Sequence, residues 1–152
     1  SRFCGNCGKE TSVTGVITSN KIKDIISHLE FLGYKIEKIA HDSEAEIFVA
    51  RHDIDNNILF HTPVAEGVFF STGLNTEKKY NSKMDRAINQ ISSRLEFSNL
   101  YYEVDESGIV TLRLGSVYWG DYNKQAFSKF IEFVKRDHLK TVSLEDSKVF
   151  ID

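Results

Sequence analysis

The chain has 152 residues, the size of one domain, of which 41% are hydrophobic and 27% charged, as in an ordinary globular protein. A net charge of −3 argues against nucleic-acid binding by the chain as a whole, and no apolar run reaches the ~20 residues of a membrane span. The polar N-terminus is not typical of a signal peptide.

The N-terminal segment holds both cysteines of the chain, Cys4 and Cys7, in C-x-x-C spacing, with Gly5 and Gly8 directly after them. Two thiolates can bind one ion only if the backbone turns tightly between them, and glycine permits such a turn. The segment therefore resembles the first half of a zinc ribbon, and zinc is the expected cofactor. A tetrahedral zinc site needs two further ligands, yet the chain has no second C-x-x-C.

Several explanations of this half-site stay open. The same cysteines of a second chain in a dimer could complete it, the partner knuckle could have been lost, or histidines could serve, from His28, His41, His52, His61 and His138. A disordered tail with reduced thiols, a redox motif and a disulfide are the other options, although a redox C-x-x-C follows a strand and none is expected here. Residues 1–18 are thus predicted to form a zinc-ribbon-like knuckle and a flexible linker.

Residues 19–140 are predicted to form one α+β domain. Ile22, Ile25 and Leu29 lie on one stripe of a helix that ends at Gly33, with His28 on its polar side. A weak strand over 34–40 and clearer strands over 46–52, 58–62 and 67–72 follow as an antiparallel meander. The Asp- and Asn-rich turn at 53–57 lacks the glycine and distal glutamate of a calcium-binding EF-hand loop.

The second half alternates in the same way. Residues 73–76 lead into a helix with Met84 and Ile91 on its apolar stripe. Strands over 100–104 and 109–114 form a hairpin around Gly108, and a short extended piece follows at 117–119. A third helix from about residue 123 carries Phe127 and Phe130 on its apolar face. Residues 141–152 form a C-terminal tail that packs as a short strand or docks elsewhere.

The order of elements is α-βββ-α-ββ(β)-α, an antiparallel sheet with helices packed on it, which predicts an α+β fold. Five stretches carry a family resemblance: Leu32-Gly33-Tyr34 at the end of the first helix, the Asp-rich turn before Ile58, the helical segment 87–91, the hairpin 104–108, and the third helix with Phe127, Phe130 and Phe133. They resemble the YbjN family within the type III secretion chaperone-like fold, over roughly residues 19–139. This resemblance implies a cytoplasmic, often dimeric bacterial protein that binds other proteins or modulates regulation, and it supplies no catalytic residues.

The sequence has no G-x-S-x-G, P-loop or H-E-x-x-H motif. His41, His52 and His61 could cluster in the meander, with the last two as cross-strand neighbours. A small enzyme with a histidine-based site is therefore one alternative, and a zinc-dependent regulatory or nucleic-acid-binding protein that uses the cysteine knuckle is another.

An aromatic group precedes the third helix: Tyr118, Trp119 and Tyr122. It is either an edge of the core or a partner-binding patch, because Trp and Tyr are enriched at interaction hot spots. Taken with the family resemblance, it predicts a non-enzymatic protein-binding or regulatory module, dimeric, with a protein or peptide partner and no membrane association.

Overall fold

The computed structural model describes residues 20–41, 45–62 and 67–151, so Cys4, Cys7 and the linker lie outside the described residues. Its elements follow one another as α1 (Asn20–Phe31), β1 (Lys35–His41), β2 (Glu46–Arg51), β3 (Ile58–His61), β4 (Val68–Lys79), α2 (Lys83–Ser92), β5 (Asn99–Val104), β6 (Ile109–Tyr118), α3 (Lys124–Ser143) and the 3₁₀ helix η2 (Glu145–Val149). The predicted α+β class is confirmed.

The described strands form one antiparallel sheet in the order β1-β2-β3-β4-β6-β5. Two of them are longer than the sequence predicts. β4 continues through residues 73–76, where Leu74 pairs with Leu112 and the buried Thr76 hydroxyl donates to the Val110 carbonyl at 2.7 Å. The expected lead into the second helix is therefore strand, because β6 offers it a pairing partner. The extended piece at 117–118 is likewise the end of β6.

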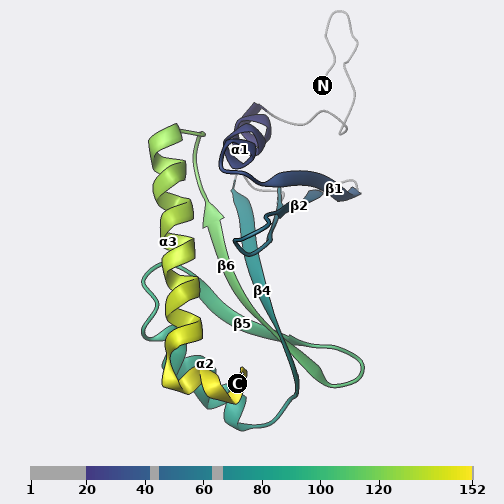
Figure 1. The fold of residues 1–152 in the computed structure, drawn as a ribbon, viewed down its shortest axis with the longest axis vertical. Helices are drawn as coiled ribbons and strands as arrows, with labels where there is room; N and C mark the ends of the chain where they lie inside the picture. Colours follow the sequence, from purple (N-terminus) through teal and green to yellow (C-terminus); the bar gives the residue numbers. More distant parts are fainter. Residues whose placement is uncertain (1–19, 42–44, 63–66, 152) are drawn as a thin grey trace, which may run out of the picture.

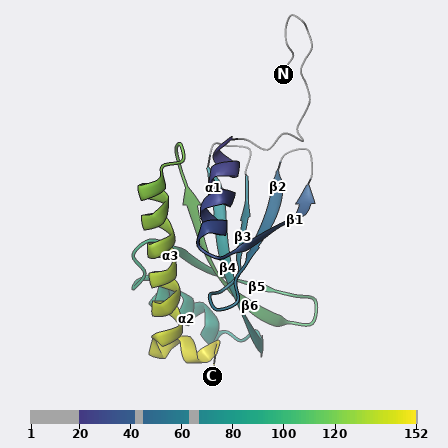
Figure 2. The same cartoon turned by 45° about the horizontal axis from the view of Figure 1, so that its top comes forward.

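The helices α1, α2 and α3 lie on the same side of the sheet (Figures 1 and 2). α1 and the first half of α3 cover β2, β3 and β4, where Phe60 stacks between Phe48 and Phe70 with ring centroids 5.1 and 5.3 Å apart. His28 belongs to this core, so its expected position on the polar side of the helix is wrong. The burial of His28 is tolerated because its Nδ1 lies 2.8 Å from the Tyr122 hydroxyl.

A second core forms where α2, η2 and the end of α3 meet β5 and β6. α2 contributes Met84, Ala87 and Ile91, which recur at helical spacing and are buried. The C-terminal tail belongs to this core: α3 runs on to Ser143, η2 lies against α2 (Figure 1), and the ring of Phe150 is fully buried.

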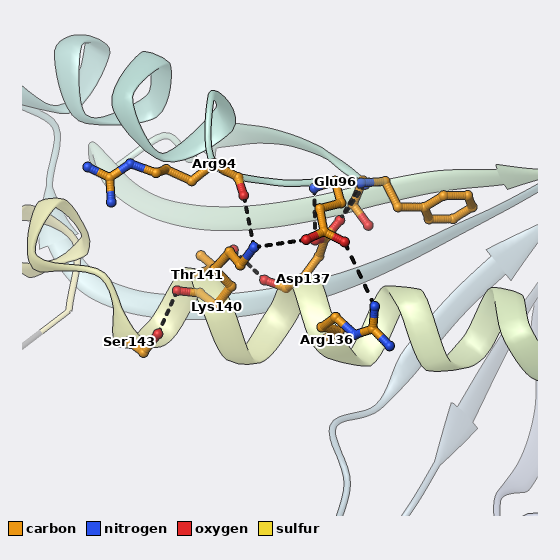
Figure 3. A network of polar contacts seen from close by, with 9 residues as sticks. Arg94, Glu96, Arg136, Asp137, Lys140, Thr141 and Ser143 are labelled. Atoms are coloured by element: carbon orange, nitrogen blue, oxygen red, sulfur yellow. Dashed lines mark hydrogen bonds and ion pairs between the residues drawn. The ribbon is translucent and has the colours of Figure 1, made fainter.

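A buried carboxylate joins α3 to the loop between α2 and β5 (Figure 3). Asp137 accepts hydrogen bonds from the backbone amides of Glu96, Phe97 and Ser98 at 3.1, 2.9 and 2.6 Å. Lys140 adds an outer contact to the Glu96 carboxylate at 3.3 Å. Three otherwise unpaired loop amides are thus satisfied by one side chain, which fixes the loop on the helix.

Candidate functional site

The face of the sheet opposite the helices is not covered by any helix of the described residues (Figures 1 and 2). Successive strand residues point to opposite faces, so the neighbours of the core residues lie there. They include Ile47 of β2, Leu59 of β3, Phe69 of β4 and Val117 of β6, which belong to neither core cluster. The uncovered face is therefore apolar along its middle strands.

Four aromatic rings gather on this face and form what we call the aromatic patch: His61, Phe69, Tyr101 and Trp119. The rings of His61 and Phe69 have centroids 5.2 Å apart. Trp119, the single tryptophan of the chain, is 64% exposed. The patch thus places a large, exposed ring beside half-buried ones on four neighbouring strands or their ends.

Two glycines let these rings lie close to the sheet. A Cβ at Gly115 would lie 2.7 Å from the Phe69 ring and 3.1 Å from that of Tyr101. A Cβ at Gly67 would lie 3.0 Å from the ring of Trp119. Real Cβ atoms essentially never come as close as 2.7 Å to another heavy atom, and contacts of 3.0–3.1 Å are tighter than nine in ten, so a residue with a side chain at either position would push the rings away from the strands.

The patch itself is uncharged at neutral pH, while ion pairs flank it. Burial lowers the pKa of His61 and raises that of Tyr101, and both shifts favour the neutral side chain. On the β1–β2 side Arg51 lies 3.5 Å from Glu37, and on the β5–β6 side Arg113 lies 2.8 Å from Glu103. The face therefore has an apolar middle between two flanks of balanced charge.

The three residues of the predicted aromatic group, Tyr118, Trp119 and Tyr122, do not lie on one surface. Trp119 lies on the aromatic patch, but Tyr118 points to the other face, where its ring centroid is 5.1 Å from that of Phe127. Tyr122 packs on the helical side and bonds to His28. Strand alternation separates the first two residues, and the end of β6 separates the third. A surface for a partner could be found from sequence only by combining alternation in 68–72 with that in 109–119.

The histidine cluster that the sequence left open does not form between His52 and His61. His61 is opposite Ile47 in the register of β2 and β3, so His52, which follows β2, is not its cross-strand neighbour. His52 instead accepts two backbone amides of its own loop at 3.0 and 2.9 Å through Nδ1, and its Nε2 lies 3.3 Å from the Leu32 carbonyl oxygen. It holds the β2–β3 loop against the end of α1. The side chain of His41 lies outside the described residues.

On the helical side, a cavity of about 220 Å³ lies between α3 and the β2–β3 loop. We call it the α3 cavity. Its walls are mostly apolar, and the residues that line it are Tyr34, Ile54, Asp55, Asn56, Ile58, Thr72, Ile131, Val134, Lys135, His138 and Leu139. At its edge Ile54 and Leu139 are 90% and 66% exposed. Apolar walls with a few polar groups are typical of small-molecule sites.

Two polar atoms of the α3 cavity residues are buried without a hydrogen-bond partner: Thr72 Oγ1 and His138 Nδ1. The Asn56 side-chain amide donates to the other ring nitrogen of His138, so the neutral imidazole carries its proton on Nδ1. Burial lowers the pKa of His138 and keeps the ring neutral. His138 follows Ile131 and Val134 on the apolar stripe of α3, and this spacing is the sequence signal that could have placed it there.

The comparisons with known proteins bear on the fold. No family model and no curated protein matches the sequence. An uncharacterised protein from Methanothermobacter thermautotrophicus superposes with a TM-score of 0.58 at 13% identity, over 86% of this chain and 99% of its own. YbjN, a proposed transcription regulator from E. coli, superposes with a TM-score of 0.57 at 9% identity, over 80% of this chain and 87% of its own.

At these identities the likeness shows the fold alone, and the predicted YbjN-like fold is confirmed. Neither structure is described as a secretion chaperone. No helix in the described ranges combines the length and the apolar character that crossing a membrane requires.

Proposed function

We propose that the chain is a non-enzymatic protein-binding module that binds its partner through the aromatic patch. The observation that carries this proposal is the uncovered sheet face, with Phe69 and Trp119 held close to the strands over Gly115 and Gly67. Exposed apolar surface costs free energy in water, and rigid aromatic side chains supply contact area at little cost in conformational entropy. A regulatory role agrees with this proposal, because a regulator acts by binding rather than by turnover.

The occupant that we propose for the patch is a second copy of this chain. A two-fold interface brings the same surface of both copies together, so the flanks of one copy must lie against those of the other without charge repulsion. The flanks do so here, because each carries one positive and one negative side chain in contact, Arg51 with Glu37 and Arg113 with Glu103. Two copies therefore meet without net repulsion, and each buries the apolar middle of the other.

Light scattering on the purified chain tests this homodimer. We expect a mass of about 35 kDa, which is twice the 17.4 kDa of one chain, and emission from Trp119 that shifts to the red on dilution as the ring becomes wet. Phe69→Lys places a charge in the patch and should give the monomer mass. The matched control is Phe31→Lys on α1, because Phe31 is 81% exposed and lies on the helical side.

A monomer mass at every concentration would contradict the homodimer, as would a Phe69→Lys variant that is still dimeric. If the wild type is monomeric and Trp119 emission nevertheless changes on addition of another protein, the patch binds a partner of different sequence. Circular dichroism of both variants shows whether the fold is kept.

We further propose that zinc binds to Cys4 and Cys7 and that the same pair of a second chain completes the site. Within the described part of the chain, no three His, Cys, Asp or Glu side chains come together as a metal site. Both ring nitrogens of His28 and of His52 already have hydrogen-bond partners, which makes these histidines poor candidates for the missing ligands.

Metal analysis of protein purified without chelator tests this proposal. We expect half a zinc ion per chain, and the loss of that zinc in a Cys4→Ser variant. One zinc ion per chain would instead mean that the other two ligands come from the same chain. Protein that contains no zinc and has two reactive thiols would contradict the site. Because the aromatic patch contains neither cysteine, Cys4→Ser also shows whether the dimer needs the metal.

A further inference from the structure

An open hollow of about 390 Å³ lies on the uncovered face of the sheet, and we call it the Arg113 hollow. Strands β2, β3, β4 and β6 and the loop between β2 and β3 contribute to its lining, which includes Val49, Asn57, Leu59, Gly73, Thr111 and Arg113. Tyr101 of the aromatic patch is opposite Arg113 in the register of β5 and β6. The hollow is therefore a neighbour of the patch on the same face.

The guanidinium group of Arg113 lies over Gly73, where β4 has no side chain. A Cβ at Gly73 would lie 3.2 Å from Nη1 of Arg113 and 3.6 Å from the methyl carbon of Thr111. The Arg113 side chain is only 24% exposed, so most of it packs on the sheet. The missing side chain of Gly73 thus leaves room both for the guanidinium group and for a ligand above the strand.

The guanidinium group is held at one nitrogen and has two others to offer. Its Nε donates to the Glu103 carboxylate at 2.8 Å. Within the described part of the chain, no hydrogen bond or ion pair involves Nη1 or Nη2 of Arg113. These two nitrogens carry four N–H groups in the planar fork that matches a carboxylate. Glu103 therefore orients Arg113 without occupying this fork.

The other walls of the hollow suit an anion with an aliphatic part. Of the described residues that line the hollow, Arg113 alone carries a charge. Asn57 is exposed, and its Oδ1 accepts from the His52 backbone amide at 3.1 Å, so its NH₂ group is a further donor on the wall. Val49 and Leu59 add apolar surface from β2 and β3. The lining thus combines one positive charge with a small apolar area.

We propose that the Arg113 hollow binds a carboxylate group at the end of a short aliphatic chain. The carboxylate accepts from Nη1 and Nη2 of Arg113, and the aliphatic part lies against Val49 and Leu59. Such a group belongs to a free short-chain carboxylic acid and equally to a glutamate side chain of a second copy of this chain. The site does not depend on the proposed homodimer, because the residues that form it all come from one copy.

The test is an NMR titration of the full chain with propionate and with propionamide, which have the same shape but differ in charge. Sodium chloride keeps the ionic strength constant. We expect saturable shifts of the backbone amides of Leu59, Gly73 and Arg113 at millimolar propionate, and binding of propionamide that is about tenfold weaker.

Two variants place the binding at the guanidinium fork. Arg113→Gln removes the fork and should abolish the preference for propionate, whereas the control Arg86→Gln, at an exposed arginine of α2, should keep it. Gly73→Ala keeps every charge but puts a Cβ against Nη1, and it should weaken the binding of propionate as well. This second variant separates the position of the guanidinium group from its charge.

The proposal is overturned if propionate gives no saturable shifts at the hollow, if propionamide binds as tightly, or if Arg113→Gln and Arg86→Gln titrate alike. Light scattering with and without propionate separates the two sources of the carboxylate. An unchanged mass indicates a free acid as the ligand, and a dimer that propionate dissociates indicates a glutamate of the second copy. A chain that is monomeric throughout contradicts the homodimer, while saturable shifts in it still support the hollow.

Discussion

Asp137→Ala is expected to lower the free energy of unfolding by about 3–5 kcal/mol, since each buried donor left without a partner costs ~1–3 kcal/mol. The Asp137 carboxylate accepts three consecutive backbone amides, those of residues 96–98, and is itself almost fully buried. Water replaces the carboxylate poorly at the amide of Ser98, which is buried, and more readily at those of Glu96 and Phe97, which are partly buried. The loss is a large part of the ~5–15 kcal/mol by which a domain is stable.

Urea unfolding followed by circular dichroism measures this loss. Asp53→Ala is the matched control, because Asp53 is exposed in the β2–β3 loop, and we expect a change within about 0.5 kcal/mol. Asp137→Asn should fall between the two, since the amide keeps one acceptor oxygen but turns an NH₂ group toward a donor. A loss below about 1 kcal/mol for Asp137→Ala would show that the loop amides find other partners.

Phe150→Ala is expected to cost about 3–5 kcal/mol, the usual range for a buried phenylalanine in a core. The Phe150 ring is fully buried, with its centroid 6.4 Å from that of Tyr102, in the cluster that α2 shares with β5 and β6. Its removal opens a cavity at the end of the chain, where η2 is held to α2 mainly by this cluster. Residues 145–151 are therefore an integral part of the second core.

Thermal and urea unfolding of Phe150→Ala should show a lower midpoint in a single cooperative step. Val142→Ala serves as the control, because Val142 is an exposed residue of α3. If Phe150→Ala lost no more stability than this control, the tail would be dispensable to the fold. A separate early transition would mean that the second core unfolds independently of the first.

The aromatic patch and the α3 cavity lie on opposite faces of one sheet. The strand β4 separates them: Phe69 faces the aromatic patch, whereas Thr72 faces the α3 cavity.

The sequence by itself determined the helices, the meander and the hairpin, because these depend on local periodicity and turn residues. The stripe of Ile22, Ile25 and Leu29 identified α1, and Met84 with Ile91 identified α2. The turn residues before Gly108 identified the β5–β6 hairpin, and Gly108 has a φ of 85° in the structure. The order of these elements predicted the α+β class, and the resemblance to the YbjN family predicted the particular fold.

Only the tertiary structure decided the length of β4, the position of His28 and the composition of both sites. Pairing with β6 keeps residues 73–76 extended, although their own sequence allows a loop. The aromatic patch joins His61, Phe69, Tyr101 and Trp119, and the α3 cavity joins Thr72 to His138. Residues so far apart in the chain meet only through strand order and register, and a local pattern cannot specify either one.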